Sequence, residues 1–291
     1  MARVPCLSYC FCVLLLALCS SSAASGQSFT CDFEYPHLPR YSSLFGVNRF
    51  GTMVGFYLAG PVNDLNAAGL IVSASGEILT YSAPGSEQTF LNAINDHGDI
   101  LGHYEATSSF FYNFELVGGE FIPIAYPGAE NTTITGINNE GDIVGTEWAT
   151  ASSQAKGFVL SHGQFTDIEF PKAAWTGASA INNKGTIVGS YGEEEFSGHG
   201  FILSDGQYTK VDFPGATYTS LLGIDDRGEI VGTSLLSEGE RSFVYRDGKF
   251  RRINIPKTSR NAVSAINAFG DIVGQAWTPT SQPAFLGTHC K

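Results

Sequence analysis

A nine-residue pattern, I-N-x-x-G-x-I-V-G, recurs along this chain and restricts its fold more than any other feature. Its copies start 42 to 47 residues apart, a period that suits one four-stranded blade of a β-propeller. They begin at Val47, Ile94, Ile137, Ile181, Ile224 and Ile266. Six copies at near-equal spacing predict six blades.

Each repeat reads as two β-hairpins. In the first, Asn-x-x-Gly separates two short apolar runs, because Asn starts a turn through its side chain and Gly supplies the positive φ that closes it. In the second, His199–Leu203 and Tyr208–Phe213 flank the tight turn Asp205-Gly206. Apolar and polar residues alternate in the second hairpin, which is typical of strands. We therefore expect four strands per repeat and no sustained helix.

The two ends of the chain complement each other. The segment from Phe29 to Pro36 matches the fourth strand of a repeat, and the last repeat ends after Pro283–Leu286, which matches a third strand. The N-terminal strand can complete the last blade and close the ring, which removes exposed sheet edges. We predict one all-β domain, a six-bladed propeller of four-stranded antiparallel blades over residues 27–290.

Residues 1–24 have the features of a secretory signal peptide. Arg3 precedes an apolar run at residues 11–18, and Ser22-Ala23-Ala24 provides a small-residue cleavage site. The apolar run is too short to span a bilayer. A lipoprotein signal that ends at Cys19 is the alternative. Either one predicts a protein that is secreted to the extracellular space or held in the cell envelope or periplasm.

Two cysteines, Cys31 and Cys290, remain after this segment. In a secreted protein such a pair suggests a disulfide that locks the ring. Alignment on Pro36 places Cys31 opposite Leu286, about 13 Å along the strand from Cys290, whereas a disulfide needs Cα atoms within about 7 Å. The tail would have to fold back to form the bond, and two free thiols are the alternative.

The chain is acidic. It has 16 Lys and Arg against 28 Asp and Glu, and Arg3 is the only charged residue before position 25, which leaves a net charge of −13 beyond that point. Such a charge repels phosphate backbones and anionic membrane surfaces. Nucleic acid and membrane insertion are therefore not expected, and a monomer is the expected state.

Candidate ligand-binding residues are aromatic. They lie in the longer connections of the second propeller face, where binding residues concentrate on loops, and could stack on sugar rings. Five follow the second strand of their repeats and one lies before a first strand: Tyr57, Tyr104, Trp148, Tyr191, Trp277 and Trp175. Packing between blades is the alternative explanation, since large aromatic residues mostly serve cores.

Cofactor signals are weak. The acidic run Glu193–Glu195 could hold calcium, as carboxylates do, although such a run is more often a solvated loop. The repeated Asn-x-x-Gly-Asp lacks the spaced acidic ligands of a calcium loop. The six histidines form no metal-binding pair. Asn131-Thr132-Thr133 is a glycosylation sequon. No metal, cofactor or catalytic residue is predicted.

An enzyme would need converging reactive groups. The six first-strand runs, expected to line the channel, contain no charged residue, whereas glycoside hydrolysis usually needs two carboxylates. A nucleophile-elbow motif is also missing. A polysaccharide hydrolase or lyase would have to use loop carboxylates such as Glu87, Glu130 or Glu147.

The whole repeat, INNxGxIVGxY followed by HGFxLxxGxFxxIDFPGA, resembles the HAF family of extracellular repeat proteins over essentially the entire chain beyond the signal segment. Its name-giving triplet is closest at His199-Gly200-Phe201 and is degenerate elsewhere. The resemblance implies secretion and a propeller-like fold but no activity. We expect a non-catalytic binding or scaffold protein for an extracellular carbohydrate or a protein partner, with the hydrolase or lyase as the alternative.

Overall fold

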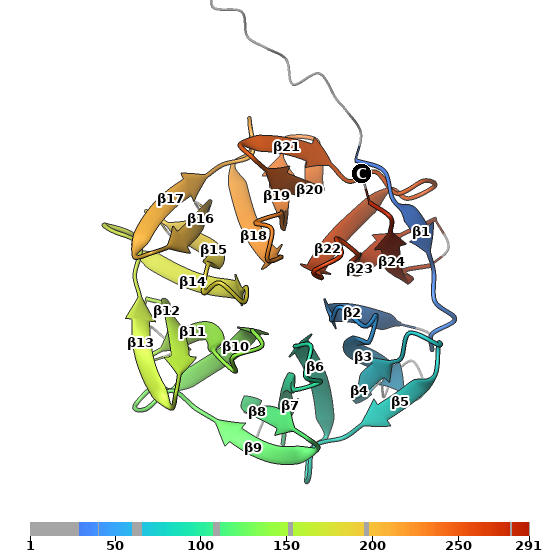
Figure 1. Ribbon diagram of the computed structural model, residues 1–291, viewed down its shortest axis with the longest axis horizontal. Coiled ribbons are helices and arrows are strands. Elements are labelled where there is room, and N and C mark those ends of the chain that lie inside the picture. The colour runs from blue at the N-terminus through green and yellow to red at the C-terminus, as the bar shows by residue number, and fades with distance from the viewer. Residues whose placement is uncertain are drawn as a thin grey trace, which may run out of the picture.

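The computed structural model describes residues 29–39, 41–59, 66–106, 111–150, 154–194, 198–279 and 281–290. Their strands form six four-stranded antiparallel sheets arranged around a central axis, as Figure 1 shows. The predicted six-bladed propeller is confirmed. Among the described residues, no helix is long and apolar enough to cross a membrane. The signal segment 1–24, Cys19 and Glu195 lie outside these residues.

The blades follow one another along the chain, each running from the axis outwards. Blades 1 to 3 consist of the strands β2 (Ser42–Val47), β3 (Met53–Ala59), β4 (Asn66–Val72), β5 (Ile78–Tyr81); β6 (Gln88–Ile94), β7 (Ile100–Glu105), β8 (Phe111–Val117), β9 (Glu120–Ile124); and β10 (Asn131–Ile137), β11 (Ile143–Trp148), β12 (Lys156–Ser161), β13 (Gln164–Ile168).

Blades 4 to 6 repeat this order, except that the last strand of blade 6 comes from the N-terminal end. Their strands are β14 (Trp175–Ile181), β15 (Ile187–Gly192), β16 (His199–Ser204), β17 (Gln207–Val211); β18 (Tyr218–Ile224), β19 (Ile230–Leu236), β20 (Gly239–Arg246), β21 (Lys249–Arg252); and β22 (Arg260–Ile266), β23 (Ile272–Trp277), β24 (Ala284–Thr288), β1 (Asp32–Glu34).

The Asn that is the second residue of the motif both closes its turn and joins two blades. Asn138 accepts hydrogen bonds from the main-chain N–H groups of Glu140 and Asp142 at 3.0 and 2.9 Å, and its own amide donates to the carbonyl of Asn182 in the next blade at 3.4 Å. Five of the six repeats make such a contact. In blade 5 the residue is Asp225, whose carboxylate cannot donate, and it binds Arg227 instead.

The innermost strands crowd one another at the axis. Each carries a β-bulge at the same position, which turns one extra residue out of the ladder. The next residue is alternately Gly and Ala around the ring, and a methyl group on Gly136 would lie 2.9 Å from the Cα of Ala180.

The last Gly of the motif leaves room for the main chain of the first strand and for a ring of the third. In blade 4, a methyl group on Gly189 would lie 2.1 Å from the carbonyl oxygen of Gly177 and 2.9 Å from the ring of Phe201, which is completely buried. The same Gly and Phe face each other in blades 2 to 6. The last Gly of the motif and the Phe of the third strand are therefore explained by the packing inside a blade.

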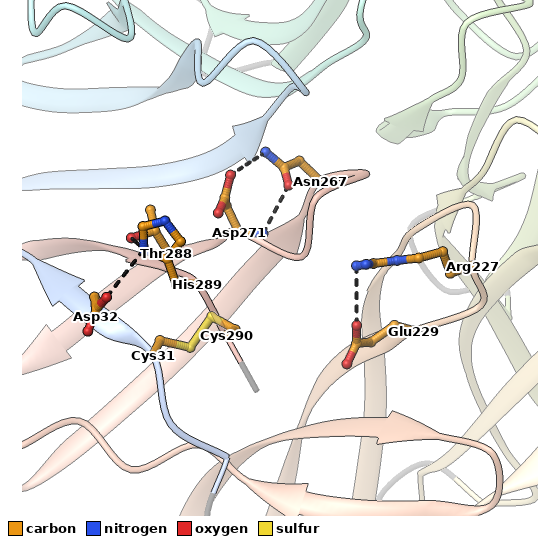
Figure 2. The surroundings of a disulfide bond; sticks show 9 residues. All are labelled: Cys31, Asp32, Arg227, Glu229, Asn267, Asp271, Thr288, His289 and Cys290. Atoms are coloured by element: carbon orange, nitrogen blue, oxygen red, sulfur yellow. Dashed lines mark hydrogen bonds and ion pairs between the residues drawn. A yellow bond between two sulfur atoms is a disulfide. The ribbon is translucent and has the colours of Figure 1, made fainter.

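The ring closes through β1. Phe33 pairs with Gly287 and Glu34 with Leu286, and a disulfide joins Cys31 to Cys290, as Figure 2 shows. The predicted register, with Cys31 opposite Leu286, was wrong by three residues. Alignment on Pro36 had assumed that all fourth strands end alike. In the true register the two cysteines meet at a Cα separation of 4.1 Å without a folded-back tail.

Candidate functional site

The predicted aromatic set divides into two groups with different surroundings. Tyr57, Tyr104 and Tyr191 occupy the second position after the motif's last Gly, whereas Trp148 and Trp277 occupy the third. Consecutive residues of a strand point to opposite sheet faces. The three tyrosines and these two tryptophans therefore point to opposite faces of their sheets.

The tyrosine group packs inside the propeller. Tyr191 is only 2% exposed and stacks on Phe170 with ring centroids 3.5 Å apart. Tyr104 contacts the rings of Tyr112, Phe114 and Phe121, and Tyr57 packs against the core of blade 1. Tyr191 has no surface left for a ligand, so its assignment as a binding residue is corrected to a core role.

The three tryptophans lie at the ends of strands. Trp175 begins β14, donates from Nε1 to the carbonyl of Glu194 at 3.1 Å and stacks on Tyr218. Trp277 ends β23, and the guanidinium of Arg260 lies 4.6 Å above its ring. Trp148 ends β11 and lines a pocket. Only the last of these rings borders a sizeable pocket among the described residues.

That pocket, which we call the 2/3 slot, lies where blades 2 and 3 meet and has a volume of ≈370 Å³. Phe111, which is 56% exposed, begins β8 and supplies a second ring. Polar groups complete the lining. The slot is formed by His103, Phe111, Asn113, Asn131, Thr132, Thr133 and Trp148.

His103 enters the slot as a neutral donor. Its ring stacks on Phe90 at 4.8 Å, and burial lowers the pKa of the imidazole to about 4. The amide nitrogen of Asn92 lies 3.1 Å from both His103 Nδ1 and the carbonyl oxygen of Ile134. Since that nitrogen donates to both, Nδ1 is an acceptor and the proton resides on Nε2.

Asn113, another residue that lines the slot, is held in place by both ends of its side-chain amide. Asn113 is 5% exposed; its nitrogen donates to the Thr132 carbonyl at 2.7 Å, and its oxygen accepts from the Ile134 N–H at 3.4 Å. These bonds tie β8 of blade 2 to β10 of blade 3. The floor of the slot is therefore rigid, which favours binding by a largely preformed site.

At three other blade boundaries, contacts between the protein's own side chains occupy or border the equivalent position. On the blade 2 side of the boundary with blade 1, Gln88 donates to Glu105 of the same blade at 2.7 Å. Between blades 4 and 5, the ring of Tyr218 lies directly against Gly198. Between blades 5 and 6, Glu240 forms an ion pair with Arg260. The 2/3 slot is open because Phe111 and Asn131 stand where this boundary has Glu240 and Arg260.

The proposed catalytic carboxylates do not line the slot. Glu147 is 5% exposed, points to the opposite sheet face from Trp148 and pairs across the strands with Lys156. Burial raises the pKa of its carboxyl group. Glu87 and Glu130 are exposed before β6 and β10, at different blade boundaries. The described lining of the slot contains no Asp or Glu.

The structure supplies no grouped metal ligands. Within the described ranges, no three His, Cys, Asp or Glu side chains lie together as a metal site requires. Glu193 and Glu194 follow β15 as exposed residues. In the repeated turn, the carboxylate of Asp142 accepts from the Asn138 amide at 3.1 Å, so the turn uses its acidic residue internally.

The mouth of the channel on the turn face holds a small polar hollow of ≈80 Å³, lined by the Asn and Asp of the six turns. Asp96 and Asp226 accept from main-chain N–H groups of neighbouring blades, Arg49 and Asn183, both at 2.9 Å. These polar groups hold the blades together, and their ring was not foreseen from the sequence.

His103, Phe111, Asn113 and Asn131 were also not singled out as binding residues. One available indication was His103, because the residue after the motif's last Gly is Phe, Thr, Ser, Thr and Gln in the other repeats. A histidine at that position breaks the pattern. The residues that lie opposite this histidine are visible only in the structure, where blades 2 and 3 meet.

Comparisons with known proteins identify the fold. No family model matches the chain, and no curated protein matches it. Among solved structures it is similar to TolB from Acinetobacter baumannii, with a TM-score of 0.61 and 13% identity over 82% of this chain. The match spans 64% of that TolB, so this chain corresponds to only part of its length.

Two further structures share the architecture. The β-propeller domain of the Trilobed protease from Pyrococcus furiosus has a TM-score of 0.56 and 10% identity, covering 87% of this chain and 97% of that one. AofleA from Arthrobotrys oligospora has a TM-score of 0.56 and 13% identity, covering 92% and 89%. At such identities the likeness establishes the fold alone.

Proposed function

We propose that this protein is a secreted binding protein that holds a neutral sugar unit of an extracellular carbohydrate in the 2/3 slot. The carrying observation is the pocket of ≈370 Å³ that two aromatic rings, Phe111 and Trp148, line where blades 2 and 3 meet. Aromatic faces match the C–H faces of a pyranose, and a few fixed polar groups orient it. A role in the extracellular space or periplasm accords with the disulfide and with the repeat resemblance to the HAF family.

The chemistry of the lining favours binding over catalysis. His103 Nε2 offers one hydrogen bond to a hydroxyl oxygen, and Asn131 and the two threonines offer neutral partners. Glycoside hydrolysis usually needs a pair of carboxylates on either side of the bond, which the described lining does not provide. Without a charged group, the slot is suited to an uncharged sugar.

A binding screen tests this proposal. Residues 27–291 would be titrated calorimetrically with neutral hexasaccharides of glucose, xylose, mannose and N-acetylglucosamine, and the products would be checked by chromatography. For the sugar that binds, Trp148→Ala and Phe111→Ala should each weaken binding about tenfold or more, because each removes one stacking surface.

Trp277→Ala is the matched control, since this ring ends the equivalent strand of blade 6 and is covered by Arg260. Its affinity should equal that of the unaltered protein. The proposal is overturned if no neutral oligosaccharide binds, if Trp148→Ala and Trp277→Ala act alike, or if shorter products appear.

A further inference from the structure

The polar hollow at the channel mouth, which we call the turn-face hollow, is bordered by an incomplete ring of hydrogen bonds. In four links, the main-chain N–H of the third motif residue donates to a side-chain oxygen of the third motif residue in the next blade, at 2.8 to 2.9 Å. The acceptors are the Asn and Asp side chains of Asp96, Asn139, Asn183 and Asp226.

The ring is open from blade 5 through blade 6 to blade 1. Blade 6 has Ala268 at the third motif position, which offers no oxygen to the N–H of Asp226, and blade 1 has Arg49, whose side chain can only donate. The main-chain N–H groups of Asp226 and Ala268 therefore have no acceptor among the described residues. Both residues line the hollow and are partly exposed. Since a main-chain donor needs a partner when water is displaced, these two groups mark the place of a ligand oxygen.

The size of the hollow decides how much of a ligand can enter it. Its volume is ≈80 Å³, whereas one water needs about 10–15 Å³. This is room for the amide of one side chain but not for a sugar ring. The rest of the ligand must lie on the surface around the mouth.

Two exposed aromatic rings lie beside the open part of the ring. Phe50 and Phe269 occupy the fourth motif position in blades 1 and 6 and are 56% and 70% exposed. The first strands of these blades, β2 and β22, are neighbours in Figure 1. The other four repeats have polar residues at this position: His97, Glu140, Lys184 and Arg227. Exposed aromatic side chains are enriched where proteins contact other proteins, so this sector suits a polypeptide.

The charges around the hollow favour a neutral acceptor. Its lining includes the carboxylates of Asp96, Asp225 and Asp226 and one guanidinium, that of Arg49, which lies 4.0 Å from Asp96. A further carboxylate would be repelled by these acidic groups. The amide oxygen of an asparagine, which Asn139 and Asn183 supply in the complete links, is an acceptor without this cost.

We infer that the turn-face hollow binds a polypeptide segment of a partner protein that inserts one asparagine side chain where Ala268 leaves the ring open. The asparagine oxygen accepts from the Asp226 N–H, a main-chain carbonyl of the segment accepts from the Ala268 N–H, and an apolar neighbour packs on Phe50 and Phe269. This inference goes beyond the proposed function, because it concerns the opposite face of the propeller and another class of ligand.

The test is a nuclear magnetic resonance titration of isotopically labelled residues 27–291 with the peptide acetyl-Ser-Phe-Asn-Phe-Ser-amide. The N–H signals of Asp226 and Ala268 should move downfield, because both groups gain an acceptor. Those of Asn139 and Asn183, which already have one, should stay in place. The same peptide with Leu or Asp in place of Asn should bind at least about tenfold more weakly, since Leu has no acceptor and Asp adds a charge.

Ala268→Asn closes the ring from within and is the decisive variant. Its side chain should accept from the Asp226 N–H as Asn183 accepts from the Asn139 N–H. The variant should therefore unfold at a higher temperature than the unaltered protein and bind the peptide at least about tenfold more weakly. A loss of binding together with a gain in stability cannot come from misfolding.

Phe269→Ala should weaken binding of the peptide about tenfold or more, because it removes an apolar contact surface. Lys184→Ala is the matched control, since this exposed residue has the same motif position in blade 4. It should leave the affinity within about twofold.

Three outcomes overturn the inference: unmoved signals of Asp226 and Ala268, equal binding of the Asn and Leu peptides, or unchanged binding by Ala268→Asn. Trp148→Ala removes a ring of the 2/3 slot and should leave peptide binding unchanged. A failure of sugar binding in that slot would not affect these measurements, so the two proposals fail separately.

Discussion

His103 shows how one residue in a repeat changes the character of a blade boundary. The position after the motif's last Gly carries Phe56, Thr146, Ser190, Thr233 or Gln275 elsewhere, and none of these brings an imidazole. Asn92 comes from the bulge of β6 and fixes the ring with its proton on Nε2. The β-bulge of the first strand, which every repeat has, thus positions the imidazole of His103 in the 2/3 slot.

The buried imidazole makes stability depend on pH. Its pKa is about 4 in the folded protein against 6.5 in the unfolded chain, so the unfolded state binds the proton more strongly. The contribution is fully present above pH 6.5 and is lost as the pH falls towards 4, a change on the order of 3 kcal/mol.

Urea unfolding of the unaltered protein and of His103→Gln at pH 7.5 and 4.5 measures this term. The variant should lose less stability between the two pH values. Equal losses would show that His103 is not kept neutral by the fold.

At the scale of single residues, the sequence predicted the fold but not the 2/3 slot. The motif Ile181–Gly189 and its copies reveal blade number because turn, bulge and crowded Gly each act within one blade or between identical neighbours. The slot depends on which side chains of two different repeats meet. Tyr104 and Trp148 looked equivalent in the sequence, and a one-residue difference in register placed them on opposite sheet faces.

Among the elements, the second strand of each blade is the most constrained. Its Gly lies between the bulge of the first strand and the Phe of the third, as Gly189 does between β14 and Phe201. The sequence shows this Gly plainly, and only the packing explains it.

Gly189→Ala should destabilise the protein by about 1–3 kcal/mol, because the added methyl group overpacks the blade. Gly177→Ala, on the neighbouring strand, is the matched control: its nearest contact would be the Thr146 hydroxyl at 3.2 Å, which can rotate away. Chemical unfolding would measure both. Similar losses would contradict this account of the motif.

For the whole molecule, closure combines a short strand, one covalent bond and packing between the first and last blades. β1 has three residues, and the disulfide spans 259 residues of sequence. Beside the disulfide, His289 Nδ1 lies 3.2 Å from Asp32, as Figure 2 shows. Phe29 and Phe33 pack into the hydrophobic core that blades 5 and 6 share, and blades 6 and 1 share another hydrophobic cluster.

Replacing both cysteines by serine should lower the free energy of unfolding by about 2–5 kcal/mol, since the open chain gains conformational freedom when unfolded. Guanidinium unfolding with and without reductant measures it. Reductant should shift the midpoint of the unaltered protein alone, and an equal shift in the double variant would mean that the loss has another cause.

The N-terminal origin of β1 also sets an order of events in synthesis. The first strand of the propeller to leave the ribosome pairs with the last, β24, so blade 6 stays incomplete until β24 has been made. Until then the growing array carries open edges that invite pairing with other chains. The disulfide between Cys31 and Cys290, which needs an external two-electron oxidant to form from the two thiols, then acts as a check on completeness, because a chain that stops before Cys290 lacks the second thiol and remains an open ring.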